Sequence, residues 1–363
     1  MVKISFAEKS QEVDQGIRSL LARNPILGNI SLTYQKDPSF FEALQVGNRQ
    51  AKVLVAAEGD EIVGFQSVSS REVFVNGRKE NIGYLSNLRL DKKYQQSGIF
   101  KRGINFLKEN RHQLAVPFYF SSIISANKLV LKKLIKPRPD GLQFVSQGGY
   151  LTKAVILLNH KKKISGSYEI IRGSQNNLDE IILFLEAEGK KKNLFPCYNR
   201  EDFNSDFLKD FKIEDFYLAV KDDRIVGMVG KWDQNNFKQN VIAGYSLAFK
   251  AFRSIYNAVG KVFHWPAIPA IGEKINFLYI SFIAVADNDQ KVFGDLLKAV
   301  YNDELKSKYL YLVLGLNERD PLIKALAGFI CLTYRSEIFL NYWQWSELSE
   351  LDKKIPYLEI ATL

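Results

Sequence analysis

The sequence is poor in the residues that bind metals or form disulfide frameworks. Its 363 residues include two cysteines, Cys197 and Cys331, and three histidines, none at metal-ligand spacing. Two cysteines so far apart do not indicate a disulfide framework, and neither has a histidine near it in sequence. We therefore expect no metal site. A catalytic Cys–His pair assembled only in three dimensions stays open, although no residue argues for it.

Long apolar runs are also missing. No stretch reaches the roughly 20 uncharged residues that span a bilayer, and residues 1–15 lack the charged-then-apolar order of a secretory signal. We expect a cytoplasmic protein with no membrane partner. The chain is 46% hydrophobic and 25% charged, an ordinary globular composition, and its length suits two domains of roughly 100 to 200 residues each.

The charge is unbalanced toward the positive, with a net charge of +10. Short lysine runs at 161–163 and 190–192 lie beside predicted loops, which is typical of solvated surface. No nucleic-acid recognition motif accompanies them, so we expect no nucleic-acid partner. A phosphorylated cofactor would suit the same positive bias.

Two stretches repeat one pattern. Residues 53–65 read as two short strands around the polar turn Glu58-Gly59-Asp60, and residues 216–228 read the same way. Each hairpin is followed by a longer apolar strand, an amphipathic helix and a further strand. The predicted ranges are 84–90, 98–110 and 117–124 in the first copy, and 277–285, 292–305 and 309–315 in the second.

This repeat predicts two tandem α/β domains, each a mixed sheet flanked by helices. The first copy takes residues 1–157, a polar linker takes 158–167, and the second copy takes 168–363. The second copy carries an apolar and aromatic insertion at about 240–274. The insertion is either a packing helix or homodimer contact, or a lid over a pocket, since long insertions often form lids or binding loops.

The junction between strand 84–90 and helix 98–110 can bind phosphate. A helix N-terminus has unpaired backbone N–H groups and partial positive charge. Gly98 lets a ligand approach the backbone because it lacks a Cβ and tolerates positive φ, and Lys101 and Arg102 add charge in the first turn. Taken alone, a glycine in such a loop more often marks a tight turn.

The element order and this loop resemble the GCN5-related N-acetyltransferase superfamily. In that family the pyrophosphate loop reads Arg or Gln, two variable residues, Gly, one variable residue, then Gly or Ala; here Gln95 and Gly98 match and Phe100 departs from the pattern. The resemblance implies mixed, mostly antiparallel sheets and acetyl-CoA as co-substrate. It assigns to cofactor binding Leu88, Arg89, Leu90, Gln95, Gln96, Ser97, Gly98, Ile99, Phe100, Lys101 and Asn127.

The second copy resembles the family less. It keeps the element order and Asn317, but the sequence Asp287-Asn288-Asp289-Gln290 replaces the glycine loop. Leu134 stands where the family usually has its general-acid tyrosine. The resemblance therefore implies one equipped copy and one degenerate copy.

The catalytic candidates are Tyr84, Glu80 and Ser122. Tyr84 occupies the position where some family members place a basic glutamate, and it could order a water that relays a proton to Glu80 or Glu72. Ser122 could bond the substrate or the thiolate. A tyrosine at such a position is more often a half-buried strand aromatic, and a strand serine such as Ser122 is more often structural.

The predicted function is transfer of an acetyl group from acetyl-CoA to an amine of a small molecule or peptide. Glu318 and Asp320, beside Asn317, would suit a cationic amine acceptor or simply water. Two alternatives stay open. One is a non-catalytic acyl-CoA sensor or scaffold, favoured by Leu134 and the degenerate copy. The other is a tandem aminoacyl or peptidyl transferase, against which the Gly98 loop argues.

Overall fold

The computed structural model describes residues 1–136, 141–162, 166–263, 265–344 and 350–363. Residues 163–165 of the predicted linker and residue 264 of the predicted insertion lie outside the described residues. The elements of the first half are β1 (Lys3–Phe6), α1 (Gln11–Ala22), β2 (Ile30–Gln35), α2 (Phe40–Gln45), β3 (Gln50–Glu58), β4 (Glu61–Val75), β5 (Arg78–Leu90), α3 (Ile99–Glu109), β6 (Tyr119–Ile124), α4 (Lys128–Leu134) and β7 (Gln143–Ile156).

The second half repeats much of this order and adds an insertion. Its elements are β8 (Glu169–Arg172), α5 (Leu178–Gly189), β9 (Phe216–Lys221), β10 (Arg224–Trp232), β11 (Gln239–Tyr245), α6 (Leu247–Phe263), β12 (Phe277–Val285), α7 (Gln290–Glu304), β13 (Tyr311–Asn317) and β14 (Cys331–Tyr342). Both hairpins, both long strands and both amphipathic helices predicted from the sequence are present, so the α/β fold class is confirmed.

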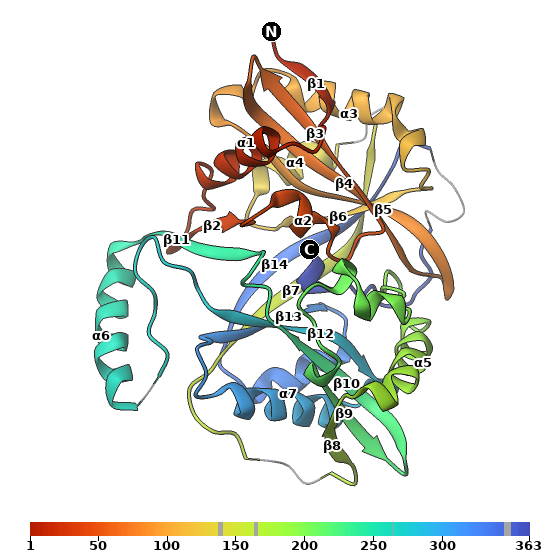
Figure 1. The fold of residues 1–363 in the computed structure, drawn as a ribbon, viewed down its shortest axis with the longest axis vertical. Coiled ribbons are helices and arrows are strands. Elements are labelled where there is room, and N and C mark those ends of the chain that lie inside the picture. Colours follow the sequence, from red (N-terminus) through yellow and green to blue (C-terminus); the bar gives the residue numbers. More distant parts are fainter. Residues whose placement is uncertain (137–140, 163–165, 264, 345–349) are drawn as a thin grey trace.

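One sheet of twelve strands runs through both halves, in the order β1-β3-β4-β5-β6-β14-β7-β13-β12-β10-β9-β8. The two halves exchange their last strands: β14 of the second half pairs with β6, and β7 of the first half pairs with β13. In Figure 1 the first half lies above and the second below, with β7 and β14 crossing between them. The exchange joins the two halves through continuous backbone hydrogen bonding.

Helices α3 and α7 cover their sheets with the apolar faces that the sequence predicts. In α3 the buried residues Ile99, Ile104 and Leu107 recur at helical spacing. In α7 the side chain of Asp289 caps the helix by accepting from the N–H of Lys291 at 2.8 Å. Among the described residues, no helix combines the length and the apolar character needed to cross a bilayer.

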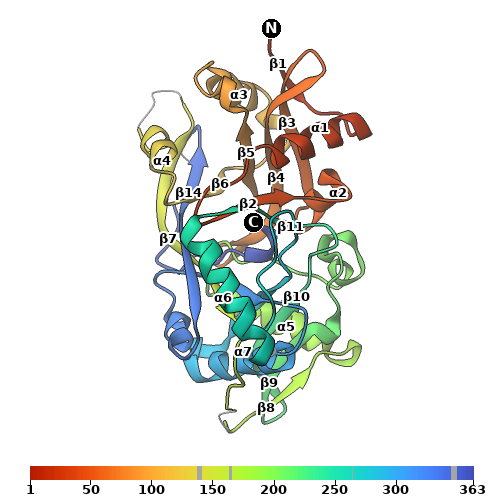
Figure 2. The same cartoon turned by 90° about the vertical axis from the view of Figure 1, so that its left-hand side faces the viewer.

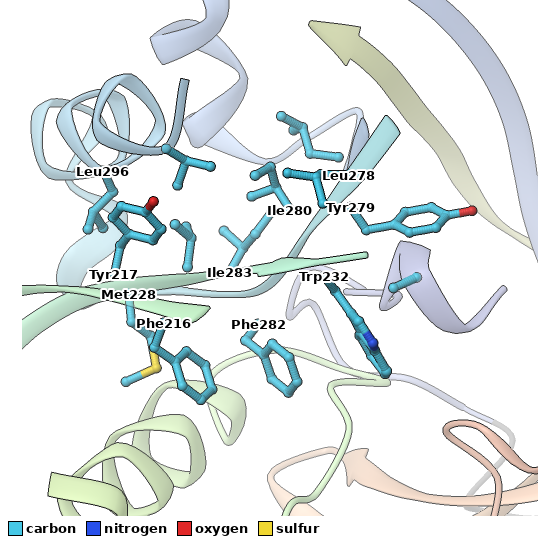
Figure 3. Close-up of a cluster of buried hydrophobic side chains, with 14 of the residues drawn as sticks. Phe216, Tyr217, Met228, Trp232, Leu278, Tyr279, Ile280, Phe282, Ile283 and Leu296 are labelled. Atoms are coloured by element: carbon cyan, nitrogen blue, oxygen red, sulfur yellow. The ribbon is translucent and has the colours of Figure 1, made fainter. Parts of the chain in front are cut away.

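The largest core lies in the second half and has two layers. Figure 3 shows Phe216, Trp232 and Phe282 on one face of the sheet, and Ile283 with Leu296 of α7 on the other. The ring centroids of Phe216 and Phe282 lie 5.0 Å apart at an interplanar angle of 64°, a favourable edge-to-face contact. The same cluster includes residues of both halves, so the halves share a core as well as a sheet.

The insertion joins the two halves at a second place. Its strand β11 pairs antiparallel with β2 of the first half, with Gln239 opposite Gln35 and Tyr245 opposite Ile30. Helix α6 follows directly and lies on the outside of the molecule in both views (Figures 1 and 2). The predicted insertion therefore contains a two-stranded ribbon with the first half and one projecting helix.

Candidate active site

Strands β5 and β6 run parallel but stay paired over only two residues. The register joins Gly83 to Tyr119 and Tyr84 to Phe120. Beyond Tyr84, residues 85–90 of β5 pair with β4 on one side, and no strand among the described residues pairs with the other side. The divergence leaves a stretch of β5 backbone able to bond an extended ligand.

The second half repeats the divergence, but the chain itself fills it. β12 and β13 pair only from Phe277 to Tyr279. Beyond that point the N–H of Phe282 donates to the Glu359 carboxylate at 2.8 Å, and the N–H of Ile283 donates to the Tyr357 hydroxyl at 3.2 Å. Residues 357–362 thus occupy the position beside β12 that stays open beside β5.

The loop 95–98 leads from the open strand to the N-terminus of α3. Gly98 is the N-cap residue of α3, with φ 76° and ψ 0°, and no side chain caps the helix at this position. A Cβ at Gly98 would meet nothing within 4 Å, so the space in front of the helix is free. The first-turn N–H groups have no partner within the helix. The geometry suits an anionic group such as a phosphate.

Local hydrogen bonds hold this loop in place. The hydroxyl of Ser97 donates to the carbonyl of Tyr94 at 2.6 Å, and the Tyr94 hydroxyl donates to Glu58 at 2.7 Å. Gln95, Gln96 and Lys101 are exposed and free to reach a ligand in front of the loop. The loop is therefore fixed by its neighbours while its outer face is accessible.

Two residues depart from the family pattern, and the structure shows how they are accommodated. The half-buried ring of Phe100 packs against the apolar cluster beneath α3, which includes Leu54 and Leu107. Leu134, at the end of α4, is buried. A large residue at position 100 thus belongs to the core, and an aliphatic one stands where the family's general acid would be.

The remaining predicted cofactor residues lie on the two diverging strands, β5 and β6, or directly after them. Leu88 and Leu90 are on the open part of β5, and Arg89 donates to the carbonyl of Leu88 at 2.9 Å. After β6, Asn127 caps α4 by accepting from the N–H of Val130 at 3.4 Å. Asn127 therefore has a structural role that does not depend on a cofactor.

A small polar pocket lies where β5 leaves β6. Its volume is about 20 Å³, which is room for about one water-sized group. Gln234, only 1% exposed, lines it, and neither amide atom of its side chain has a partner among the described residues. Buried polar groups are nearly always bonded, so Gln234 is a ready partner for a ligand. Other lining residues include Lys36, Arg71, Tyr84, Ser86, Asn87 and Lys238.

Three cations of this pocket come from different parts of the fold. The antiparallel register that pairs Gln35 with Gln239 places Lys36 opposite Lys238. Lys238 Nζ donates to the backbone oxygens of Ala361 at 3.0 Å and of Leu363 at 2.9 Å. Arg71 Nε donates to Asn48 Oδ1 at 2.8 Å, and its guanidinium lies 4.3 Å from the ring centre of Tyr84.

The electrostatics of the cluster follow from burial and mutual repulsion. Burial first, then the charges of Lys36 and Arg71, lower the pKa of Lys238 from 10.5 to about 7. Burial and the charges of Arg71 and Arg89 likewise lower the pKa of Lys36 to about 8. Both effects penalise the charged form of an amine. A substrate amine bound here would be held neutral, and therefore nucleophilic, for the same reasons.

We expect the substitution Lys238→Met to flatten the pH dependence of stability above neutrality. Because the folded-state pKa of Lys238 is depressed to about 7, the unfolded chain binds a proton there that the folded chain does not. Stability is thus lost as pH falls from the unfolded value near 10.5 to about 7, and is constant below. Urea unfolding of both proteins at several pH values measures the difference. Identical slopes would contradict the depressed pKa.

The structure brings only one of the three predicted catalytic residues to the pocket. Tyr84 lines it, is buried, and stacks on Phe120 at 4.4 Å. Glu80 lies four strand residues earlier, about 13 Å away along β5 at about 3.3 Å per residue, and pairs with Val73. Ser122 lies on β6, opposite Ile338 of β14. Burial raises the pKa of Tyr84, so its hydroxyl stays protonated.

The carboxylates suggested for the acceptor site are engaged elsewhere. Glu318 forms an ion pair with Arg335 at 2.7 Å and accepts from the N–H of Gly149 at 2.9 Å. Asp320 is buried and accepts from Lys192 Nζ at 2.9 Å. Neither lines the pocket. Cys197 is buried, which raises its pKa to about 12 and leaves it a poor nucleophile.

Sequence reasoning missed Lys36, Lys238 and Gln234. Each lies at or beyond the end of a strand, in a local sequence that resembles any other loop. They meet only because β11, from the insertion, pairs with β2 from the first half. The one available signal was the insertion itself, because Lys238 lies just before it and an insertion often covers a binding site.

The two halves together define a fold. Each has an antiparallel run of strands that ends in a diverging parallel pair, and the last strands are exchanged between them. This fold is similar to that of a solved N-myristoyltransferase. The described residues hold no group of three or more His, Cys, Asp or Glu side chains arranged to bind a metal ion.

Saccharomyces cerevisiae N-myristoyltransferase, solved with bound myristoyl-CoA, has a similar structure. It superimposes with a TM-score of 0.62 over 97% of this chain and 87% of that chain, at 10% sequence identity. A structure of the yeast protein with myristoyl-CoA and inhibitors gives 0.61 over 97% and 84%, also at 10%. A GCN5-related N-acetyltransferase from Anabaena variabilis gives 0.49 over 93% and 72%, at 10%. No family model and no curated protein matches the sequence.

Proposed function

We propose that this protein transfers an acyl group from an acyl-CoA to an amine, with the cofactor in the first half. The observation that carries the proposal is the unfilled divergence of β5 and β6, which leads directly to the free N-terminus of α3. The yeast protein of similar fold carries myristoyl-CoA. The acyl-CoA supplies the thioester. The residues of this chain bind and orient the two reactants and exchange protons with them.

The cofactor would be held by backbone groups rather than by charge pairs. The open edge of β5 from Leu85 to Leu90 suits the amides of the pantetheine arm, and the first-turn N–H groups of α3 suit the pyrophosphate. Lys101 is exposed beside these N–H groups and adds a positive charge. A backbone cradle of this kind explains why Gly98, rather than a bulky residue, opens the helix.

The acyl group that fits best is short. The pocket at the end of the open edge is small, about 20 Å³, which favours a short acyl group over a long chain. Acetyl-CoA is therefore the proposed co-substrate. The proposed acceptor is an amine of a small molecule or peptide, which would enter between the two halves beside Gln234 and Lys238.

The cations of the pocket suit the chemistry of acyl transfer. The positive charges of Lys36 and Arg71 favour the neutral form of the attacking amine and stabilise the negative charge that develops on the thioester oxygen. A neutral Lys238, with its pKa near 7, can accept the proton that the amine releases. The hydroxyl of Tyr84 stays protonated and can donate a hydrogen bond in the same space.

The release of free CoA thiol tests the proposal. Wild-type protein is mixed with acyl-CoAs from acetyl to myristoyl and with a panel of primary amines, and thiol release is followed with time. We expect release that depends on both protein and amine, fastest with the shortest chain. Binding of acetyl-CoA with no release across the panel would instead favour an acyl-CoA sensor, a reading that the buried Leu134 also supports.

We expect Tyr84→Phe to lower kcat by roughly tenfold, the effect of one lost hydrogen bond in the transition state. The Tyr84 ring, which stacks on Phe120, is kept in this variant, so KM for acetyl-CoA should change little. Tyr256→Phe is the matched control, because its buried hydroxyl has no partner among the described residues and lies on α6. Equal kcat in all three proteins would remove Tyr84 from the reaction.

A further inference from the structure

Helix α6 is attached to the molecule along one side only. Its inner side rests on the segment that follows it: Arg253 Nε donates to the carbonyl of Pro269 at 2.8 Å, Asn257 Nδ2 donates to that of Ile268 at 3.0 Å, and Tyr256 stacks on Trp265 at 5.6 Å. Gly260 is the one buried residue of the helix. In Figure 1 the helix lies to the left of the twelve-stranded sheet, and in Figure 2, which turns that side toward the viewer, it lies in front.

The outer face of α6 is apolar and exposed. Leu247, Ile255 and Val262 are 85%, 65% and 72% exposed, and they recur at helical spacing on one face. The same face includes Phe252, Val259 and Phe263, which are also exposed. Single exposed apolar side chains are ordinary, but a contiguous apolar face of this length marks an interaction site.

The charge of this region is positive. From 240 to 274 the basic residues are Lys250, Arg253, Lys261 and Lys274, and the only acid is Glu273. Lys250 and Lys261 are exposed on the side of α6 away from Ile255, as the helical repeat of 100° per residue places them. An apolar face backed by lysines, with no acidic residue in the helix, is the pattern of a helix that lies in a membrane interface.

We propose that α6 docks the protein on the surface of an anionic lipid membrane. The apolar face would enter the boundary between headgroups and acyl chains, and Lys250 and Lys261 would face the lipid phosphates. The sequence predicts no membrane partner because it has no spanning segment, but an interfacial helix needs none. The inference is independent of the acyl transfer proposed above.

The area of the face argues against a second copy of the chain as its occupant. Seventeen residues of helix are about 25 Å long and about 10 Å wide, so the face covers about 250 Å². A stable dimer buries about 800 Å² on each partner. A membrane requires neither a large area nor acidic partners on another chain.

Vesicle flotation of the full-length protein tests this assignment. We expect binding to phosphatidylcholine vesicles that contain phosphatidylserine, weaker binding to phosphatidylcholine alone, and loss of binding as salt is raised. The double variant Ile255→Asp, Val262→Asp should bind roughly tenfold or more weakly, because two side chains no longer insert. Leu183→Asp, 67% exposed on α5, is the matched control and should bind as wild type does.

Three results would overturn the assignment. They are no binding of the wild type to either vesicle, equal binding by the double variant, and a wild-type dimer in sedimentation velocity that the double variant converts to monomer. The thermal midpoint of each variant shows that it folds, and the single variants replace the double one if it does not. Acetyl-CoA affinity should be the same in wild type and double variant, so this test and the cofactor test fail separately.

Discussion

Gly98→Glu should reduce the affinity for acetyl-CoA by roughly a hundredfold or more, measured by isothermal titration calorimetry. Two effects act together. The new side chain would fill the space in front of α3, where a Cβ at Gly98 now meets nothing within 4 Å. Its negative charge would repel the pyrophosphate from the positive end of the helix. The fold should persist, because Gly98 is exposed and touches no core residue.

Gly272→Glu is the matched control for this substitution. Gly272 also has positive φ, at 89° against 76° for Gly98, and a Cβ there also meets nothing within 4 Å. Both variants carry the same backbone strain of about 1 to 2 kcal/mol and the same added charge, but Gly272 lies in the insertion. Wild-type affinity in Gly98→Glu, or equal loss in both variants, would contradict a cofactor site at the loop.

Tyr357→Ala should lower the free energy of unfolding by about 3 to 5 kcal/mol, the usual cost of truncating a buried aromatic residue. Tyr357 is buried, and its ring centroid lies 4.7 Å from that of Phe195. It belongs to the segment that fills the divergence of β12 and β13. Removing the ring leaves a cavity and opens that divergence. Urea unfolding followed by circular dichroism measures the loss.

Tyr357→Phe separates the ring from its hydroxyl. The hydroxyl donates to Glu359 at 2.8 Å and accepts from the N–H of Ile283 at 3.2 Å. Losing the hydroxyl removes the partner of the buried Ile283 N–H and one of the hydrogen bonds of Glu359, at a cost of about 1 to 3 kcal/mol. If Tyr357→Ala and Tyr357→Phe both unfold like the wild type, residues 357–362 do not hold the second half together in the way described.

Local elements could be predicted from the sequence because their signals are local. Each of these elements depends on a few neighbouring residues: the turn at Gly59, the strand predicted at 84–90, which is part of β5, and the amphipathic helix α3. The loop before α3 could be recognised because the positive φ at the start of this helix favours a glycine, Gly98. The family resemblance added the order of the elements, and the solved yeast structure has a similar fold.

The rest depends on pairings between distant residues, which no local pattern encodes. Nothing near β14 indicates that it would pair with β6, some two hundred positions away. The apolar strand 277–285 has the same appearance whether a cofactor or Tyr357 fills the space beside it. Lys36 and Lys238 are ordinary loop lysines until the β2–β11 ribbon places them side by side.

The stoichiometry of acetyl-CoA binding to the wild-type protein shows directly whether only the first half holds the cofactor. One divergence is open beside β5, and its counterpart beside β12 is filled by residues 357–362. We expect one bound acetyl-CoA for each chain in a calorimetric titration. Two bound molecules would show that the second divergence also accepts the cofactor, and none would show that the first does not; either result contradicts this expectation.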